Sequence, residues 1–156
     1  RFVNEGGTLI FLNRSTQFAT ERLDLKIHDA LRGLSDGEFY APGPRLNVTL
    51  DPRDPLCYGM PEQIAVWNEQ SPAWDPPSGE AVHTVARYTA GGVLASGWLL
   101  GESRIAGKAA LLRIQQGKGQ IVLFGMRPQY RAQSYLTFKL LFNALLLSSS
   151  TWETVP

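Results

Sequence analysis

The chain has 156 residues, of which 44% are hydrophobic and 19% charged, and 15 basic residues balance 14 acidic ones to a net charge of +1. This length suits one globular domain, and the composition excludes an intrinsically disordered chain. The absence of a basic block argues against a nucleic-acid-binding protein. We expect no membrane span, because the longest apolar run, near residues 140–147, is far below the roughly 20 residues that cross a bilayer.

The N-terminal part predicts one buried strand followed by short helices. Residues 1–5 resemble the last turn of a helix closed by two glycines, so we expect the domain to lack its first strand and helix. Residues 8–12 are a continuous apolar run, which is typical of a buried parallel strand. Short helices are expected over residues 13–23 and 27–32.

The middle of the chain predicts several strands separated by proline and glycine loops. Residues 45–50 alternate polar and apolar side chains, as a strand with one exposed face does, and residues 64–67 can form another. Residues 82–88 and 93–100 read as a strand pair joined by a glycine-containing turn. We therefore expect a β-hairpin at this point.

The C-terminal part predicts two strands and a helix. Residues 109–114 and 120–126 are apolar strands joined by the tight turn at 116–119, whose Gly-Lys-Gly does not match a phosphate-binding loop. Residues 134–147 fit a helix capped by Ser134. Its wide apolar face is expected to consist of Leu136, Leu140, Phe142, Leu145 and Leu146.

The order of these elements predicts the fold class. Buried strands of the parallel type lie near both ends of the chain, with antiparallel pairs between them. This order indicates a three-layer α/β fold with a mixed sheet. We expect one domain over residues 1–148 and a frayed tail over residues 149–156.

The sequence offers no metal site. Zinc needs three or four converging ligands, and the two histidines, His28 and His83, lie outside any His-x-x-Glu or His-Glu-x-x-His pattern. The single cysteine, Cys57, lies in a proline-rich loop instead of at a strand-turn-helix elbow. We therefore expect no metal or cofactor within the chain, and we interpret Cys57 as a small apolar core residue.

Residues 127–131 are the best candidates for a binding site. They follow a buried strand and precede a helix, so they lie at the carboxyl end of a strand, where open α/β sheets bind ligands. Arg127 and Arg131, with Gln129 between them, could bind a carboxylate or phosphate. The alternative is that the arginines pair with acidic residues and hold the loop or a neighbouring domain in place.

A tryptophan cluster is a second possible binding feature. Trp67, Trp74 and Trp98 could form a carbohydrate platform, although tryptophans in strands more often pack in a core or against another domain. An exposed apolar face around them would favour an interaction domain.

Specific segments resemble a known family. Residues 117–131 (GKGQIVLFGMRPQYR) and 137–144 (TFKLLFNA) resemble the end of a class I glutamine amidotransferase-like domain. More narrowly, they resemble the domain at the C-terminus of large bacterial zinc carboxypeptidase-like proteins. Residues 39–43, 55–61 and 94–101 fit the same resemblance, which covers nearly the whole chain.

This resemblance implies a flavodoxin-like fold and a periplasmic or secreted parent whose zinc site lies upstream of this chain. Amidotransferases of this fold use a Cys-His-Glu triad. Neither the position of Cys57 nor that of either histidine fits that triad, so the activity does not carry over. Similar non-catalytic domains in some sugar hydrolases help subunits to associate.

Three hypotheses follow for function. The first is a non-catalytic interaction domain that packs on an upstream domain or segment of its parent, or on a second copy. The second is an anionic-ligand-binding module that uses Arg127, Gln129 and Arg131. The third is a degenerate enzyme that uses Cys57.

Overall fold

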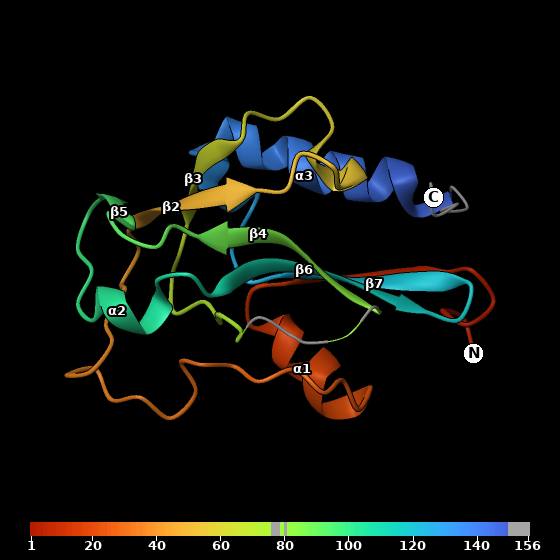
Figure 1. Ribbon diagram of the computed structural model, residues 1–156, viewed down its shortest axis with the longest axis horizontal. Helices are drawn as coiled ribbons and strands as arrows, with labels where there is room; N and C mark the ends of the chain where they lie inside the picture. The colour runs from red at the N-terminus through yellow and green to blue at the C-terminus, as the bar shows by residue number, and fades with distance from the viewer. Residues whose placement is uncertain (76–78, 80, 150–156) are drawn as a thin grey trace.

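A mixed β-sheet forms the centre of the molecule in the computed structural model, which describes residues 1–75, 79 and 81–149 (Figure 1). Its strands are β1 (Thr8–Leu12), β2 (Arg45–Leu50), β3 (Gln63–Trp67), β4 (Val82–Tyr88), β5 (Leu94–Ser96), β6 (Ala109–Gln116) and β7 (Gly119–Phe124). The order across the sheet is β1-β7-β6-β4-β2-β3, with β5 paired to β2. Only the β1–β7 pair is parallel among the described strands, and the other pairs are antiparallel.

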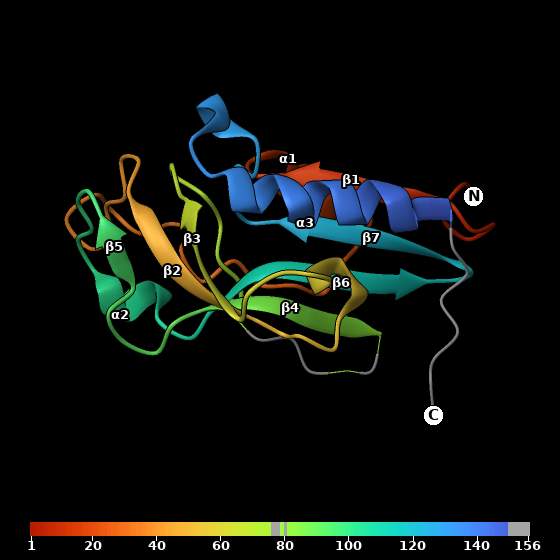
Figure 2. The same cartoon turned by 90° about the horizontal axis from the view of Figure 1, so that it is seen from above.

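Helices cover both faces of the sheet. They are α1 (Ser15–Arg22), α2 (Glu102–Ile105) and α3 (Tyr135–Leu146), with short 3₁₀ turns η1 (Pro55–Cys57), η2 (Tyr130–Ala132) and η3 (Leu147–Ser149). Figures 1 and 2 place α3 on one side of the sheet and α1 on the other. The predicted three-layer α/β fold is confirmed.

Two apolar clusters fill the spaces between these layers. Leu111 and Phe124 point to the α3 side, where Leu140 completes the packing. Leu112 and Leu123 point to the α1 side. Because β6 and β7 are covered on both faces, their sequences are continuous apolar runs with little polar alternation.

The second predicted helix, over residues 27–32, is wrong. These residues form an irregular loop, because their backbone bonds to a neighbouring segment. Ala30 N donates to Ala73 O at 2.8 Å, and Asp29 forms an isolated bridge with Trp74. The apolar side chains that suggested a helix pack from a loop instead, with Ile27 against the α1-side cluster and Leu31 against the α3-side cluster.

The predicted hairpin between residues 82–88 and 93–100 is also wrong. β4 forms as expected, but β2 and β6 occupy its two edges. The chain after Gly92 therefore pairs with β2 instead of β4. Of the predicted strand over residues 93–100, only β5 (Leu94–Ser96) forms. By contrast, the β6–β7 hairpin is confirmed, with Gly117 in the left-handed region at φ 60°.

The apolar face predicted for α3 is largely not the buried one. Of its five members only Leu140 is buried, and Leu136, Phe142, Leu145 and Leu146 are exposed. The face toward the sheet is instead made of Thr137, Leu140, Asn143 and Ala144. Two of these polar side chains are satisfied there: Thr137 Oγ1 donates to Pro128 O at 2.6 Å, and Asn143 Nδ2 donates to Leu56 O at 2.8 Å.

The first residues of the chain form a short turn ahead of β1. Residues 1–5 contain one helical turn, in which Glu5 N donates to Arg1 O at 3.2 Å. The expected tail lies almost entirely outside the described residues, so the boundary at residue 148 stays a prediction. No helix within the described part of the chain is long and apolar enough to cross a membrane.

Candidate functional site

Three segments that are distant in the sequence meet at the carboxyl ends of β1 and β7. They are residues 13–14 after β1, 67–70 at the end of β3, and 127–132 after β7, and we call them the carboxyl-edge cluster. Backbone bonds fix their spacing: Asn13 N donates to Phe124 O at 2.7 Å, and Arg127 N donates to Trp67 O at 3.3 Å. The cluster occupies the edge of the sheet at which α/β proteins bind ligands.

Side chains also join the three segments. Asn13 Nδ2 donates to Glu69 O at 3.5 Å, and the Arg14 guanidinium donates to Gln70 Oε1. The ion pair between Arg127 Nε and Glu69 Oε2 spans 3.5 Å. Arg127 therefore pairs with an acidic residue, as the alternative interpretation of the two arginines expects.

Backbone strain is concentrated in this cluster. Asn13, Gln70, Arg131 and Ala132 have φ angles of 49°, 47°, 48° and 52°, and the described residues contain only one other non-glycine residue with positive φ, Asp24. Each such conformation costs on the order of 1–3 kcal/mol, and strained residues tend to gather at functional sites.

Tyr130 lies at the centre of the segment after β7. The guanidinium carbons of Arg127 and Arg131 are 5.1 and 5.2 Å from its ring centroid, and the Trp67 ring is 5.0 Å away. Both predicted arginines therefore gather around one aromatic ring. Gln129 is exposed at the start of η2, and ligand binding by the three residues stays a prediction.

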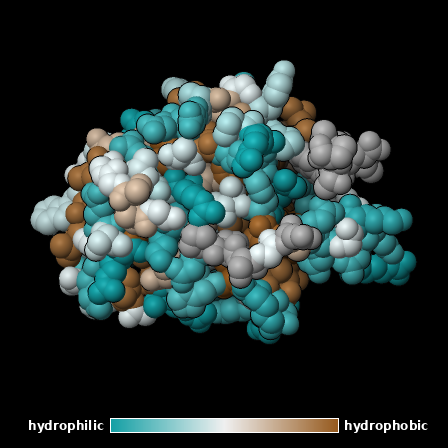
Figure 3. Space-filling model, in the orientation of Figure 1, coloured by the Kyte–Doolittle hydropathy of each residue, from teal (hydrophilic) through white to brown (hydrophobic). Residues whose placement is uncertain are grey.

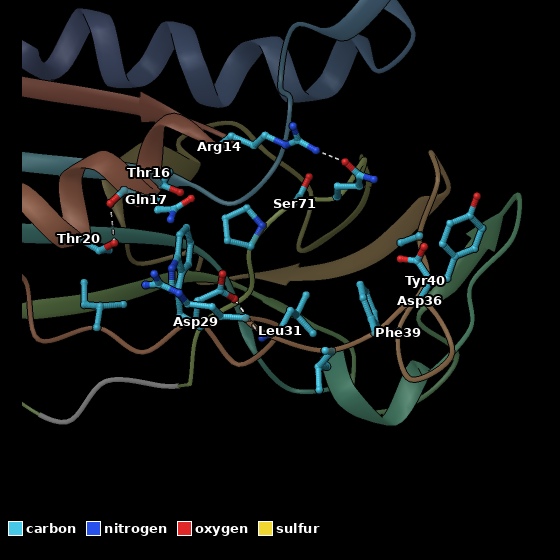
Figure 4. Close-up of a pocket in the computed structure, with 17 residues that line it drawn as sticks. Arg14, Thr16, Gln17, Thr20, Asp29, Leu31, Asp36, Phe39, Tyr40 and Ser71 are labelled. Atoms are coloured by element: carbon cyan, nitrogen blue, oxygen red, sulfur yellow. Dashed lines mark hydrogen bonds between the residues drawn. The ribbon is translucent and has the colours of Figure 1, made fainter.

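A pocket of about 430 Å³ adjoins the cluster, and Arg14 and Gln70 line its border (Figure 4). Its walls are α1, residues 27–41 and residues 70–74. The volume falls within the range of small-molecule sites, roughly 300–1,000 Å³. Residues 27–32, which the sequence predicted as a helix, line this pocket as part of an irregular loop.

Asp29 holds the pocket wall in place. Its Oδ1 accepts from Leu31 N at 3.0 Å and from Ala73 N at 3.3 Å, so its carboxylate links two walls. Trp74, which is 1% exposed, also lines the pocket. The lining thus combines polar side chains with aromatic ones.

No family model and no curated protein matches the sequence. Among solved structures, a cytoplasmic protein, STM3548, from Salmonella typhimurium superposes with a TM-score of 0.55 and 11% identity over 94% of this chain. A ThuA-like protein from Parabacteroides merdae superposes with a TM-score of 0.54 and 11% identity over 99% of this chain. The fold is that of ThuA-like proteins.

ThuA-like proteins have a class I glutamine amidotransferase-like fold, so the predicted flavodoxin-like, amidotransferase-like architecture is confirmed. This chain spans 56% and 65% of the lengths of the two solved structures. None of the similarities found links it to a zinc carboxypeptidase. That parent stays a prediction from the sequence resemblance.

Cys57 is the last residue of η1 and lies in the core. It is 4% exposed, and its sulfur is 4.0 Å from Val85 O. Burial raises the pKa of the thiol to about 12, with a further contribution from the negative charges of Asp54 and Asp51. A thiol that is protonated at neutral pH is a poor nucleophile.

His83 belongs to a separate charged group at the start of β4. Its Nε2 is 3.2 Å from Asp51 Oδ2 and 3.5 Å from Asp54 Oδ2, and Arg113 Nε is 2.9 Å from that same Asp54 oxygen. The carboxylates of Asp51 and Asp54 in this group raise the pKa of the Cys57 thiol. A catalytic thiol needs a lowered pKa, so this group does not activate Cys57. Within the described residues, no three His, Cys, Asp or Glu side chains could hold a metal ion.

The three tryptophans have different environments. Trp74 is buried, Trp67 stacks on Tyr130, and Trp98 is 68% exposed in the loop after β5. A buried ring cannot belong to a surface platform, so the three tryptophans form no carbohydrate platform, and Trp74 packs in the core as the sequence favoured. The exposed apolar surface that the sequence associated with the tryptophans lies instead on α3.

Proposed function

We propose that this chain is a non-catalytic interaction domain and that the outer face of α3 is its docking surface. This face comprises Tyr135, Leu136, Phe142, Leu145 and Leu146, whose exposed fractions range from 52% to 76%. Large contiguous apolar surfaces on soluble proteins mark interaction sites. This exposed face is the observation that carries the proposal.

The chemistry of α3 supports a docking role. Its only charged residue is Lys139, whose Nζ donates to Gly59 O at 3.0 Å. The helix therefore has a single charged side chain, whereas a solvent-facing helix normally has a charged outer side. Tyr58, which is 79% exposed, extends the patch, because Asn143 on α3 donates to its backbone carbonyl at 3.1 Å. The face drawn in Figure 3 is by contrast mostly hydrophilic.

The candidate site supports binding more than catalysis. The carboxyl-edge cluster contains guanidinium, amide and phenol groups and the carboxylate of Glu69, but neither the thiol nor an imidazole. Cys57 is buried and has a raised pKa, and His83 is held beside two aspartates. A nucleophile and its base are therefore not brought together in this cluster.

The sequence resembles the C-terminal domain of zinc carboxypeptidase-like proteins. The first partner to test is therefore the peptidase domain of such a parent. In that proposal zinc and proteolysis belong to the parent, and its compartment is periplasmic or secreted.

Affinity capture with matched baits tests the docking surface. The wild-type chain, a Phe142→Ser/Leu146→Ser variant and a control Trp98→Ser variant are used as baits, with melting curves to confirm folding. We expect the same protein to be retained by the wild type and the control but lost from the α3 variant. Equal capture by all three baits, or no specific capture by any, would refute the docking surface. Glutamine hydrolysis, or zinc-dependent release of C-terminal residues, by the purified chain would refute the non-catalytic role.

A specific observation favours a second candidate, the anionic-ligand module. Arg131 takes a strained left-handed backbone conformation beside Tyr130, and together with Arg127 it puts two guanidinium groups near one ring. Titration calorimetry with phosphate and with citrate tests it. Binding by the wild type that is lost in Arg131→Ala but kept in the distant Arg22→Ala control would support the module, and no binding of either anion would refute it.

A further inference from the structure

The walls of the pocket beside the carboxyl-edge cluster are joined to one another. Gln70 N donates to Ala41 O at 3.3 Å, which links two of the walls at the rim. Arg32 Nη2 donates to Glu21 Oε1 at 3.0 Å and links the loop to α1. The hydrogen bonds of Asp29 described above add a third link. A site whose walls are already joined loses little conformational entropy when a ligand binds.

The lining of the pocket carries both signs of charge. Its charged side chains are Arg14, Arg32, Asp29 and Asp36, which sum to no net charge at neutral pH. Arg32 is paired with Glu21, whereas Arg14 and Asp29 form no ion pair within the described part of the chain. A lining without net charge favours neither a polyanion nor a polycation.

Asp29 has one carboxylate oxygen available to a ligand. Its Oδ1 accepts the N–H groups of Leu31 and Ala73, and no donor among the described residues reaches its Oδ2. Asp29 is half-buried, whereas Asp36 is exposed. Because a half-buried carboxylate is less hydrated than an exposed one, Asp29 gains more from a cationic partner.

Arg14 supplies a positive charge on another side of the pocket. Its guanidinium donates to the amide oxygen of Gln70, whose backbone is held in the left-handed region at φ 47°. This contact fixes the position of the guanidinium without cancelling its charge. Figure 4 shows the Arg14 side chain extended toward Gln70, with Asp29 on the opposite side in that view. The remaining N–H donors of the planar guanidinium match the geometry of a carboxylate.

An apolar surface accompanies these two charges. Leu31 and Phe39 line the pocket and are only partly buried, so their side chains present apolar area to it. The volume of about 430 Å³ equals the space of about 14 water molecules, at roughly 30 Å³ each. A small organic molecule that carries both charges and an apolar body therefore fits the pocket in size and in chemistry.

We propose that this pocket binds a small zwitterion with an apolar body, of the size of a free apolar amino acid or a dipeptide. The carboxylate of the ligand pairs with Arg14, its ammonium group pairs with Asp29 Oδ2, and its apolar side chain lies against Leu31 and Phe39. This inference does not rest on the docking role of α3, and it uses none of the residues of the proposed anionic-ligand module.

Titration calorimetry of the purified chain tests the ligand class with matched compounds at up to about 10 mM, because ligands of this size often bind weakly. L-phenylalanine and glycyl-phenylalanine carry both charges, whereas phenylpropionate lacks the ammonium group and phenylethylamine lacks the carboxylate. We expect a zwitterion to bind at least about tenfold more tightly than either singly charged compound, since each contact between charged groups contributes about that factor. The tighter of the two zwitterions identifies free amino acids or short peptides as the source.

Two variants test the site itself. Arg14→Gln and Asp29→Asn should each weaken binding of the zwitterion at least about tenfold. The control Arg22→Gln changes an exposed arginine of α1 outside the pocket and should bind like the wild type. Asp29→Asn keeps an oxygen for the two backbone N–H groups, and melting curves confirm that it folds.

The inference would be overturned if neither zwitterion bound, or if a singly charged compound bound as tightly as the zwitterions. Unchanged binding in Arg14→Gln would also overturn it. If Asp29→Asn does not fold, the exposed Arg14→Gln variant decides the outcome. The capture experiment with the α3 variants and the anion titration with Arg131→Ala read the proposed function independently of these measurements.

Discussion

Removing the buried charge of Asp54 should strongly destabilise the protein. The Asp54 side chain is fully buried. Its Oδ1 accepts from Leu56 N at 2.9 Å, and its Oδ2 pairs with Arg113 Nε at 2.9 Å and lies 3.5 Å from His83 Nε2. Asp54→Asn keeps an oxygen for the first contact. It replaces the second oxygen by an NH₂ group that faces the Arg113 donor.

The magnitude follows from the burial of both groups. Breaking one side of a buried ion pair costs roughly 3–5 kcal/mol. The Arg113 side chain is 18% exposed and keeps some hydration, so we expect the lower end of that range, about 3 kcal/mol, for Asp54→Asn. Asp54→Ala also loses the cap of η1, which adds about 1 kcal/mol.

Urea unfolding followed by circular dichroism measures these losses. The matched control is Asp24→Asn, which removes the exposed carboxylate paired with Lys26 and should change the free energy of unfolding by at most about 0.5 kcal/mol. If Asp54→Asn cost less than about 1 kcal/mol, the buried pair would not be a major stabilising contact and the reasoning would be wrong.

Three further predictions concern other parts of the molecule. Cys57→Ala should lower the free energy of unfolding by about 1–2 kcal/mol. The native thiol should react slowly with thiol reagents at pH 8, because its pKa is about 12. Rapid labelling of the folded protein would contradict the raised pKa. Gly101→Ala should lower the free energy of unfolding by about 2–4 kcal/mol, because φ is +78° and a Cβ would lie 2.1 Å from Glu38 O. Gly91→Ala is the control, because its Cβ would meet open space, and it should leave the urea unfolding curve unchanged. The pKa of Asp51 is lowered from 3.8 to about 2, chiefly by its hydrogen bond from Arg53, so this contact stabilises the fold above pH 3.8 and is lost as the pH falls toward 2. Allowing for solvent screening, the difference between wild type and Arg53→Gln should be on the order of 1 kcal/mol at neutral pH and shrink in acid; a difference independent of pH would count against the pair.

Local side-chain patterns in the sequence determined most of the strands. The apolar run at residues 8–12, the alternation at 45–50 and the turn at 116–119 each specify a conformation through contacts within a few residues, and each forms the predicted strand or turn. The strand at 8–12 is parallel as predicted, but it is half-buried where the sequence predicted a buried strand. Which strands pair with each other depends on contacts between distant parts of the chain, which local patterns do not specify. The sequence favoured a hairpin after β4, but β2 and β6 already fill both edges of β4.

The candidate site could be predicted only in part. The position of Arg127 and Arg131 after a buried strand placed them at the ligand-binding edge, and the structure gathers both around Tyr130. Their neighbours Asn13 and Glu69 come from other loops, and no local pattern identifies them. Their approach depends on the parallel β1–β7 pair, a contact between residues more than a hundred positions apart.

The orientation of α3 was decided only by the tertiary structure. Its sequence is apolar around most of its circumference, so hydrophobic periodicity cannot say which side is buried. The buried side carries Thr137 and Asn143, because the carbonyls of Pro128 and Leu56 accept hydrogen bonds from these side chains. The sequence by itself therefore determined that a helix forms here and that it is apolar. The choice of its buried face required acceptor groups that only the folded chain places beside it, and that choice leaves Phe142 and Leu146 at the surface.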